Sequence, residues 1–277
     1  MPPFTFFGSP QFAVYVLDKI VEAGFIPRVL VCNPDKPVGR KATITPPLSK
    51  QFITKKKLET KIIQPETKKD LVEMSDVFSE CEVAVVVAYS KIIPDEVLSH
   101  FPNGVIGVHP SLLPLYRGAS PIQEVILQGD SETGVSLYRV DAEVDHGPIF
   151  IQEKIEVAQD DTYLSLEKKL GTVGGSLLVK YFKDIMTGAI QPEEQNHSHA
   201  SLTRKFSTQD GFVDLEKDDP AIIARKIRAL NPEPGVHAFI DNVRTKLLEV
   251  KKIDEGWVVT SIIPEGKNKR VAHIALK

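Results

Sequence analysis

The chain of 277 residues is long enough for a sizeable hydrophobic core and for two domains. Its 42% hydrophobic and 26% charged residues are ordinary for a soluble globular protein, and its formal net charge of −3 argues against strong non-specific binding of nucleic acid by the whole molecule. Residues 201–277 nonetheless contain 14 Lys and Arg against 11 Asp and Glu, which permits a basic surface on the C-terminal part.

The cysteines and the apolar runs limit the cellular setting. Cys32 and Cys81 lack the spacing of a metal site or of a disulfide framework, so we expect no bound metal. The first residues lead directly into the apolar segment 4–7, which favours a strand over a signal peptide. No apolar run approaches the roughly 18–20 residues that span a bilayer. We expect a cytoplasmic protein without a membrane segment.

The first sixty residues have the pattern of a doubly wound α/β sheet. Residues 4–7 predict a strand, and Ser9 and Pro10 suit the N-cap and first position of a helix that ends near Gly24. Residues 29–32 predict a second buried strand. The glycine turn lacks the full G-x-G-x-x-G pattern, so a dinucleotide site is poorly supported. Residues 33–48 contain four prolines and several basic groups, and we expect an extended surface loop that is either solvated or functional.

The middle of the chain continues the alternation of helices and strands. The apolar run 83–87 suits a central parallel strand, and residues 105–109 suit the next one. Helical spacing at 162–186 is interrupted by glycines, which mark either a break or a close packing contact. The other expected helices are 50–58, 68–79 and 121–128, and the other expected strands are 61–63, 133–140 and 149–155.

Two segments place polar groups where such a fold builds its site. The stretch VIGVHPSLLPLYR, residues 105–117, is a buried strand that ends at His109 and then enters a proline-bracketed loop. Ligands of open α/β sheets bind beyond the carboxyl ends of the strands, and an imidazole there can move a proton. The turn 141–148 contains carboxylates beside His146 and Gly147. A structural histidine and an ordinary polar turn remain the alternative interpretations.

The C-terminal part predicts a separate small domain. Residues 191–201 are polar and lack periodicity, as in a linker, and a helix is expected at 221–230. Short apolar runs then predict strands at 236–240, 246–250, 257–262 and 271–276, which is typical of a small β-barrel. We predict a Rossmann-like domain at 1–188, a linker at 189–206 and an OB-like β-barrel domain at 207–277.

The order of these segments resembles the methionyl-tRNA formyltransferase family over nearly the whole chain. The HPSLLP segment and the Asp-x-Gly turn indicate the wider group of folate-dependent formyltransferases, which includes sugar and glycinamide-ribonucleotide enzymes. The first long loop and IRALNPEPG point more narrowly to the enzymes of initiator tRNA. The matching segments are FFGSPQFAV, NPDKPVGR, VVVAYSKIIPDEVL, HPSLLPLYRGASPIQ, GDSETGVSLYRVDAEVDHGPI, RKFSTQDGFVD and IRALNPEPG.

The resemblance implies a reaction and a set of site residues. The donor would be 10-formyltetrahydrofolate, the acceptor would be the methionine amino group of initiator methionyl-tRNA, and the enzyme would act as a monomer. His109 would stabilise the oxyanion of this acyl transfer, and Asp145 would pair with it or relay the proton of the amine. Arg40 and Lys41 would contact the tRNA. The folate site would be formed by Ser111, Leu112, Leu113 and Pro114, bordered by Tyr89, Lys91 and Ile93.

One position departs from the family pattern. The family has an asparagine two residues before the histidine, and this chain has Gly107. Strand alternation places Gly107 and His109 on the same face, so the site would lack one side-chain donor. Losing an oxyanion donor typically costs on the order of 10²–10³ in rate. Water or another group could replace the amide, turnover could be impaired, or the fold could serve binding alone. A Gly107→Asn variant would then gain rate.

The alternatives differ in their acceptor. A sugar-nucleotide N-formyltransferase would share the catalytic core, but the NPDKPVGR loop and IRALNPEPG argue against it. A non-catalytic folate- or tRNA-binding protein would bind folate without turnover on any amine.

Overall fold

The computed structural model describes residues 1–39, 41–254 and 256–276 in two compact units. The first unit contains Met1–Arg117, Gly134–Lys154 and Lys168–Ala200. The second contains Gly118–Thr133, Ile155–Glu167 and Ser201–Lys277.

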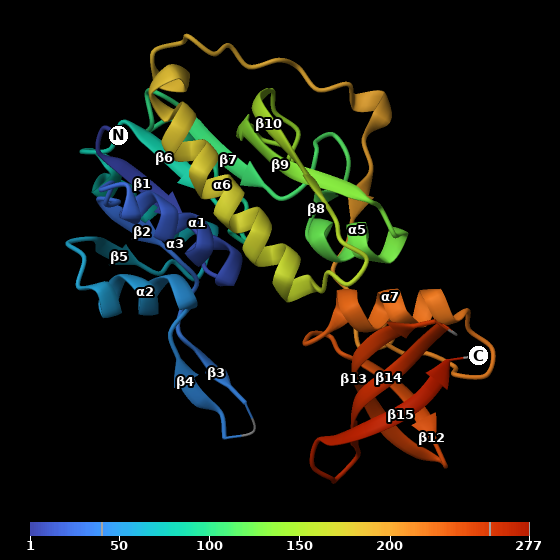
Figure 1. The fold of residues 1–277 in the computed structure, drawn as a ribbon. Helices are drawn as coiled ribbons and strands as arrows, with labels where there is room; N and C mark the ends of the chain where they lie inside the picture. Colours follow the sequence, from blue (N-terminus) through green and yellow to red (C-terminus); the bar gives the residue numbers. More distant parts are fainter. Residues whose placement is uncertain (40, 255, 277) are drawn as a thin grey trace. The chain divides into compact units, whose positions relative to one another are not determined.

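The first unit is built on a seven-stranded sheet of order β10-β9-β7-β6-β1-β2-β5 (Figure 1). The strands β5, β2, β1, β6 and β7 pair in parallel, and β9 runs antiparallel to β7. The central strands are buried along their length, as expected for a sheet covered on both faces. Their bounds are β1 Phe4–Phe7, β2 Val29–Val31, β5 Lys61–Ile63, β6 Val83–Val86, β7 Val105–His109, β9 Glu132–Arg139 and β10 Ile149–Glu156.

Helices α1 (Gln11–Glu22) and α6 (Tyr163–Met186) pack closely on one face of this sheet. A Cβ at Gly171 would lie 2.6 Å from the Cβ of Tyr15 on α1, and a Cβ at Gly174 would lie 2.8 Å from Cγ1 of Val108 on β7. The helix is continuous from Tyr163 to Met186. Its glycines therefore mark close packing, the second of the two expected possibilities.

The opposite face of the sheet carries a hydrophobic cluster beneath shorter helices. Phe7 and Val105 of the strands pack in one cluster with Leu71, Phe78 and Val97. The covering elements are α3 Lys68–Glu73, the 3₁₀ turn η1 Ser75–Phe78 and α4 Asp95–Leu98, and α2 Leu48–Lys56 follows the hairpin described below. Val105 of β7 belongs to this cluster, whereas Val108 contacts α6 on the other face. Because side chains alternate along a strand, Gly107 and His109 lie on the same face as Val105, the side of α3 and α4.

Three local expectations need correction. Ser9 does not cap α1: its hydroxyl accepts a hydrogen bond from the backbone N–H of Asn33 at 2.9 Å, and Pro10 occupies the N-cap. The expected helix 68–79 is divided at Met74 into α3 and η1, and Phe78 at the end of η1 is fully buried. The loop 33–48 contains an antiparallel hairpin of β3 Lys36–Val38 and β4 Thr43–Thr45, which projects from the sheet (Figure 1).

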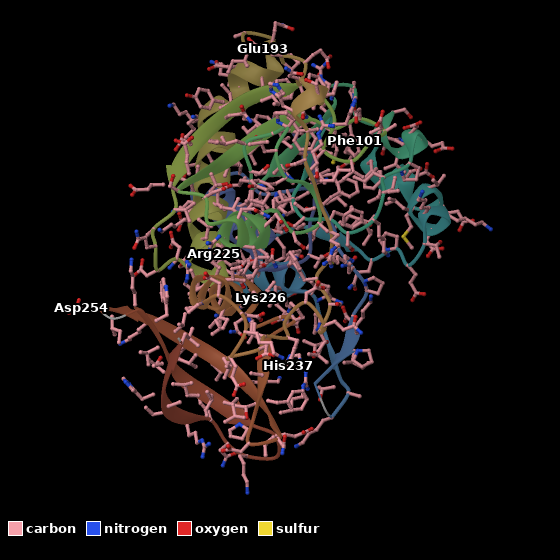
Figure 2. The ribbon with its side chains drawn as sticks, turned by 90° about the vertical axis from the view of Figure 1, so that its right-hand side faces the viewer. Phe101, Glu193, Arg225, Lys226, His237 and Asp254 are labelled. Carbon is pink, nitrogen blue, oxygen red and sulfur yellow. The ribbon has the colours of Figure 1, made fainter. Side chains whose placement is uncertain are left out.

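The second unit contains a four-stranded antiparallel sheet of order β12-β13-β14-β15. Its strands are β12 Val236–Ile240, β13 Val243–Ile253, β14 Gly256–Pro264 and β15 Arg270–Leu276. Helix α7 (Pro220–Leu230) precedes it, and the carboxylate of Asp219 caps this helix by accepting from the N–H groups of Ala221 and Ile222. Arg225 and Lys226 lie on α7 and His237 lies on β12 (Figure 2). The unit also contains α5 Pro121–Gln128 and β11 Leu202–Thr203. The 3₁₀ turn η2 His197–His199 belongs to the first unit, and the division between the units falls within β8 Arg117–Gly118.

The predicted class, an α/β chain with a mostly parallel sheet followed by a small β domain, is confirmed. Within the parts of the chain that the structure describes, no helix is both long and apolar enough to cross a bilayer.

Candidate active site

The site is built where β7 ends beside the antiparallel strand β9. Gly107 pairs with Tyr138 and His109 pairs with Ser136 across these strands. Paired residues of antiparallel strands point to the same face, so these side chains share one surface of the sheet. All five residues of β7 are buried, and His109 is 5% exposed.

Both ring nitrogens of His109 face oxygen atoms. Its Nε2 lies 2.9 Å from the carbonyl oxygen of Tyr116, and its Nδ1 lies 3.5 Å from Oδ2 of Asp145. A carbonyl oxygen only accepts, so Nε2 carries the hydrogen of that bond. Its Nδ1 faces the carboxylate of Asp145, so the two ring nitrogens are turned to two different oxygen partners. The structure therefore brings together His109 and Asp145, the two residues that the sequence analysis paired.

Asp145 is held from several directions. Its side chain is 15% exposed, and its Oδ1 accepts a hydrogen bond of 2.7 Å from the Tyr138 hydroxyl. Its carbonyl accepts 3.0 Å from Nε2 of Gln195, which also donates to the Gly147 carbonyl at 2.7 Å. Buried Arg117 donates in turn to Oε1 of Gln195 at 2.6 Å. The acidic turn is therefore fastened to a segment about fifty residues later in the chain.

Two non-glycine residues at this site have left-handed backbones. Asp145 has φ +50° and Tyr116 has φ +58°, although each carries a side chain. Such conformations cost on the order of 1–3 kcal/mol and persist where the surroundings hold them, most often at functional sites. Here one of them presents the carboxylate to His109 and the other presents its carbonyl to the same ring.

The Ser-Leu-Leu-Pro loop is tied to β9 through buried polar groups. The Ser136 hydroxyl donates to the Ser111 carbonyl at 2.7 Å and accepts from the N–H of Leu113 at 3.0 Å. Gln152 donates to that hydroxyl at 2.8 Å and to the Leu113 carbonyl at 2.9 Å. The Leu113–Pro114 peptide is cis. Leu113 is buried, whereas Leu112 and Pro114 are partly exposed, so the latter side chains are the accessible ones of the loop.

The tyrosine loop after β6 is engaged in the core. The ring of Tyr89 packs edge-on against Phe7 at 5.5 Å, and burial raises the pKa of its hydroxyl to about 12. Ile93 belongs to the same hydrophobic cluster. The ammonium of Lys91 donates to the carbonyls of Pro65 and Glu66. These three residues shape the loop, and their contact with folate stays a prediction.

Comparison with known proteins decides the family. The Formyl transferase model matches residues 4–182, and the model of the formyl transferase C-terminal domain matches residues 205–268. The methionyl-tRNA formyltransferase of Thermotoga maritima is 39% identical over 251 residues, which cover 90% of this chain and 79% of that protein. The chain belongs to the methionyl-tRNA formyltransferase family. The family member from Caldicellulosiruptor saccharolyticus is 38% identical over 254 residues, which cover 90% of this chain and 80% of the relative.

Solved structures share the fold at lower sequence identity. The methionyl-tRNA formyltransferase from Clostridium thermocellum has a TM-score of 0.59 at 16% identity and covers 99% of this chain and all of that one. HypX from Aquifex aeolicus in complex with tetrahydrofolic acid has a TM-score of 0.66 at 15% identity, over 97% of this chain and 46% of that chain. The sugar 3N-formyl transferase WlaRD has a TM-score of 0.63 at 21% identity, over 100% and 99%. As a member of the methionyl-tRNA formyltransferase family, this chain is a transferase of formyl groups.

Gly107, the position at which the resemblance implied an asparagine, has no room for a side chain. A Cβ at this position would lie 2.2 Å from Cε1 of Tyr138 and 2.8 Å from its hydroxyl oxygen. The expectation that Gly107 shares a face with His109 is correct. The rate gain expected for Gly107→Asn stays a prediction, and the Tyr138 ring fills the space that the longer side chain would need.

Of the two residues expected to bind tRNA, the structure describes Lys41, which lies between strands β3 and β4. Arg40 is outside the described residues. Lys41 is exposed, and Val38 and Ile44 on the paired strands are 57% and 63% exposed. Exposed apolar and basic groups on one hairpin are compatible with a macromolecular ligand.

Sequence reasoning assigned no role to the other residues that hold the candidate site together, namely Tyr116, Arg117, Ser136, Tyr138, Gln152 and Gln195. The alternation of residues 133–140 offered a signal for Ser136 and Tyr138, since both lie on one face of a strand expected beside the histidine strand. Gln195 lies in the expected linker, where no pattern distinguishes a residue that packs from one that is solvated.

Within residues 1–39, 41–254 and 256–276, no group of three His, Cys, Asp or Glu side chains is arranged to hold a metal ion. Cys32 and Cys81 are buried free thiols, and burial raises the pKa of Cys32 to about 11.

Proposed function

We propose that the His109–Asp145 site transfers the formyl group of 10-formyltetrahydrofolate to the amino group of methionine on initiator methionyl-tRNA. The observation that carries this proposal is the buried pair of His109 and Asp145 at the end of β7, in a chain of the methionyl-tRNA formyltransferase family. The pair joins two segments that are 36 positions apart and that the reaction requires together.

The proposed chemistry is an acyl transfer in which the amine loses one proton and the folate nitrogen gains one. The neutral amine attacks the formyl carbon and an oxyanion forms on the formyl oxygen. His109 stabilises this oxyanion as a hydrogen-bond donor, which requires Nε2 to exchange its bond to the Tyr116 carbonyl for one to the substrate. Asp145 orients the imidazole by facing its Nδ1. The amine loses one proton, the folate nitrogen gains one, and the bond between that nitrogen and the formyl carbon breaks.

The folate would lie against the Ser111–Pro114 loop. The buried hydroxyl of Ser136 fixes this loop, and the partly exposed Leu112 and Pro114 offer apolar surface to a flat ring. Tyr89, Lys91 and Ile93 form the neighbouring loop in the proposal. The structures named for tetrahydrofolic acid and 5-N-formyl-tetrahydrofolate among those sharing this fold support folate as the class of donor.

The tRNA would use residues other than those of the His109–Asp145 site. We assign Arg40 and Lys41 to its acceptor end. We assign the C-terminal residues 207–277 to further contacts, after a catalytic domain at 1–188 and a linker at 189–206. The excess of Lys and Arg in the last part of the chain supports this assignment. The protein would act in the cytoplasm as a monomer, with the tRNA and the folate as its partners.

The direct test offers several acceptors to one enzyme. Purified protein is incubated with 10-formyltetrahydrofolate and either methionyl-tRNA or an amino-sugar nucleotide, and formylated product is measured. We expect formyl-methionyl-tRNA and no formylated sugar. Product only from the sugar would establish the sugar-nucleotide alternative. Folate binding without product from either acceptor would establish a binding protein instead.

A further inference from the structure

A tyrosine occupies the space beside the catalytic histidine that Gly107 leaves open. Tyr138 faces Gly107 across the strand pair and is 6% exposed. The distances from an ideal Cβ at Gly107 are 2.2 Å to Cε1, 2.4 Å to Cζ and 2.8 Å to the hydroxyl oxygen. The hydroxyl end of the ring thus stands where a side chain at position 107 would begin. Glycine at 107 and tyrosine at 138 therefore form one packing unit.

The hydroxyl of Tyr138 donates its hydrogen bond to Asp145. It lies 2.7 Å from Oδ1 of Asp145, and an ionised carboxylate only accepts. Burial first, and then the negative charge of Asp145, raise the pKa of Tyr138 well above its ordinary value, so the phenol stays protonated at neutral pH. Oδ2 of the same carboxylate faces Nδ1 of His109 at 3.5 Å. Phenol, carboxylate and imidazole consequently follow one another in a chain.

The hydrogen bond from Tyr138 orients the carboxylate. Gln195 holds the backbone of Asp145 through its carbonyl oxygen, and this contact does not set the side-chain torsion angles. The hydrogen bond from the phenol to Oδ1 directs the other carboxylate oxygen, Oδ2, to the imidazole.

We propose that Tyr138 is a positioning residue for formyl transfer, acting through Asp145 on His109, and that Gly107 is required to admit its ring. The proposal rests on the proposed function for its kinetic consequence. Its structural consequence, the state of the His109 ring, does not depend on turnover.

The test removes the hydroxyl and keeps the ring, in a Tyr138→Phe variant. Hydrogen bonds to charged groups are the stronger ones, so kcat is expected to fall on the order of 10- to 100-fold. The KM values for folate and tRNA are expected to stay close to those of the wild type. A Tyr181→Phe variant is the matched control, because it deletes the same hydroxyl from α6. An unchanged kcat in Tyr138→Phe would overturn the proposal.

A double-mutant cycle separates positioning from packing. In an Asp145→Asn background the further change Tyr138→Phe is expected to have little effect on kcat, because the hydroxyl acts through the carboxylate. Independent effects that multiply in the double variant would show that Tyr138 acts by another route and would contradict the proposal.

The third readout works even if the protein forms no product. With ¹⁵N-labelled histidine, the ring nitrogen resonances of His109 report its partners. We expect Tyr138→Phe to shift the Nδ1 resonance in the same direction as Asp145→Asn. A wild-type spectrum in Tyr138→Phe would overturn the inference, whereas absent formylation with a shifted resonance would overturn only the proposed function.

Discussion

Oδ2 of Asp145 lies 3.5 Å from Nδ1 of His109, although His109 is the last residue of β7 and Asp145 lies in the turn between β9 and β10. The separation is long for a hydrogen bond and short for an ion pair, so the contact depends on charge and orientation more than on a fixed proton position. A protein that holds such a pair at the end of its central sheet has the two groups that a proton-coupled acyl transfer uses.

Removing the charge of Asp145 is expected to disable the transfer. In Asp145→Asn the amide cannot supply the negative charge that faces the imidazole, and kcat should fall on the order of 10²–10⁴. Steady-state kinetics with methionyl-tRNA measures this fall. Asp141→Asn in the same turn is the control, since its carboxylate contacts His146 instead, and we expect little change there. Equal losses in both variants would mean that the turn needs its charge and not this carboxylate.

Adding a side chain at Gly107 is expected to damage the fold before it can help the chemistry. Gly107→Asn places atoms within van der Waals radii of the Tyr138 ring, and overpacking of this kind costs about 1–3 kcal/mol, or roughly 2–12 °C in Tm. Thermal unfolding measures the loss. The double variant Gly107→Asn with Tyr138→Leu has the missing room and should regain stability. A single variant as stable as the wild type would show that the ring moves aside freely.

The Ser136 hydroxyl is expected to matter for folate through the loop that it holds. Ser136→Ala leaves the buried N–H of Leu113 and the carbonyl of Ser111 without this partner, at a cost of about 1–3 kcal/mol. A less rigid loop should bind tetrahydrofolate more weakly, which calorimetric titration can measure. Ser176→Ala on the exposed side of α6 serves for comparison. Wild-type affinity in Ser136→Ala would separate the loop from the folate site.

His237 is expected to make the C-terminal unit sensitive to mild acid. Burial first, and then the positive charges of Arg244 and Lys246, lower its pKa. The unfolded chain therefore takes up this proton at a higher pH than the folded protein. The contribution of the neutral imidazole to stability is fully present above the unfolded pKa of about 6.5 and is lost as the pH falls from there toward the lower folded value.

The measurement for His237 is the unfolding midpoint at pH values on both sides of 6.5. His237→Gln should show a smaller drop on acidification than the wild type. His273→Gln, an exposed histidine on β15 of the same unit, should drop as the wild type does. An identical pH slope in the wild type and His237→Gln would remove His237 as its source.

The sequence predicted the order of the main elements because buried strands and amphipathic helices have distinct periodicities. The sequence did not predict features that depend on contacts between residues far apart in the chain. The hairpin β3–β4 interrupts a proline-rich loop whose strands are only three residues each, too short for an alternating pattern. Ser9 has the composition of a cap, but the backbone of Asn33 uses its hydroxyl. A local pattern cannot report either event.

The same limit applied to the site. His109 and Asp145 stood out because each follows a strand or occupies a polar turn, and the family order joined them. From the sequence, Gly107 was interpreted as the loss of a hydrogen-bond donor. Only the pairing of β7 with β9 shows that the Tyr138 ring fills the space beside Gly107. The role of Gln195 required the linker to fold back on the turn 145–147. Both contacts join segments that are distant in the chain, and no pattern in a single sequence indicates that such segments meet.

The most direct test of the central claim is the single-turnover rate of formyl transfer to methionyl-tRNA by the wild type and by His109→Ala. We expect the wild type to produce formyl-methionyl-tRNA and the variant to be slower by on the order of 10²-fold or more, with tetrahydrofolate still bound. Equal rates in the two proteins would contradict the assignment of this site.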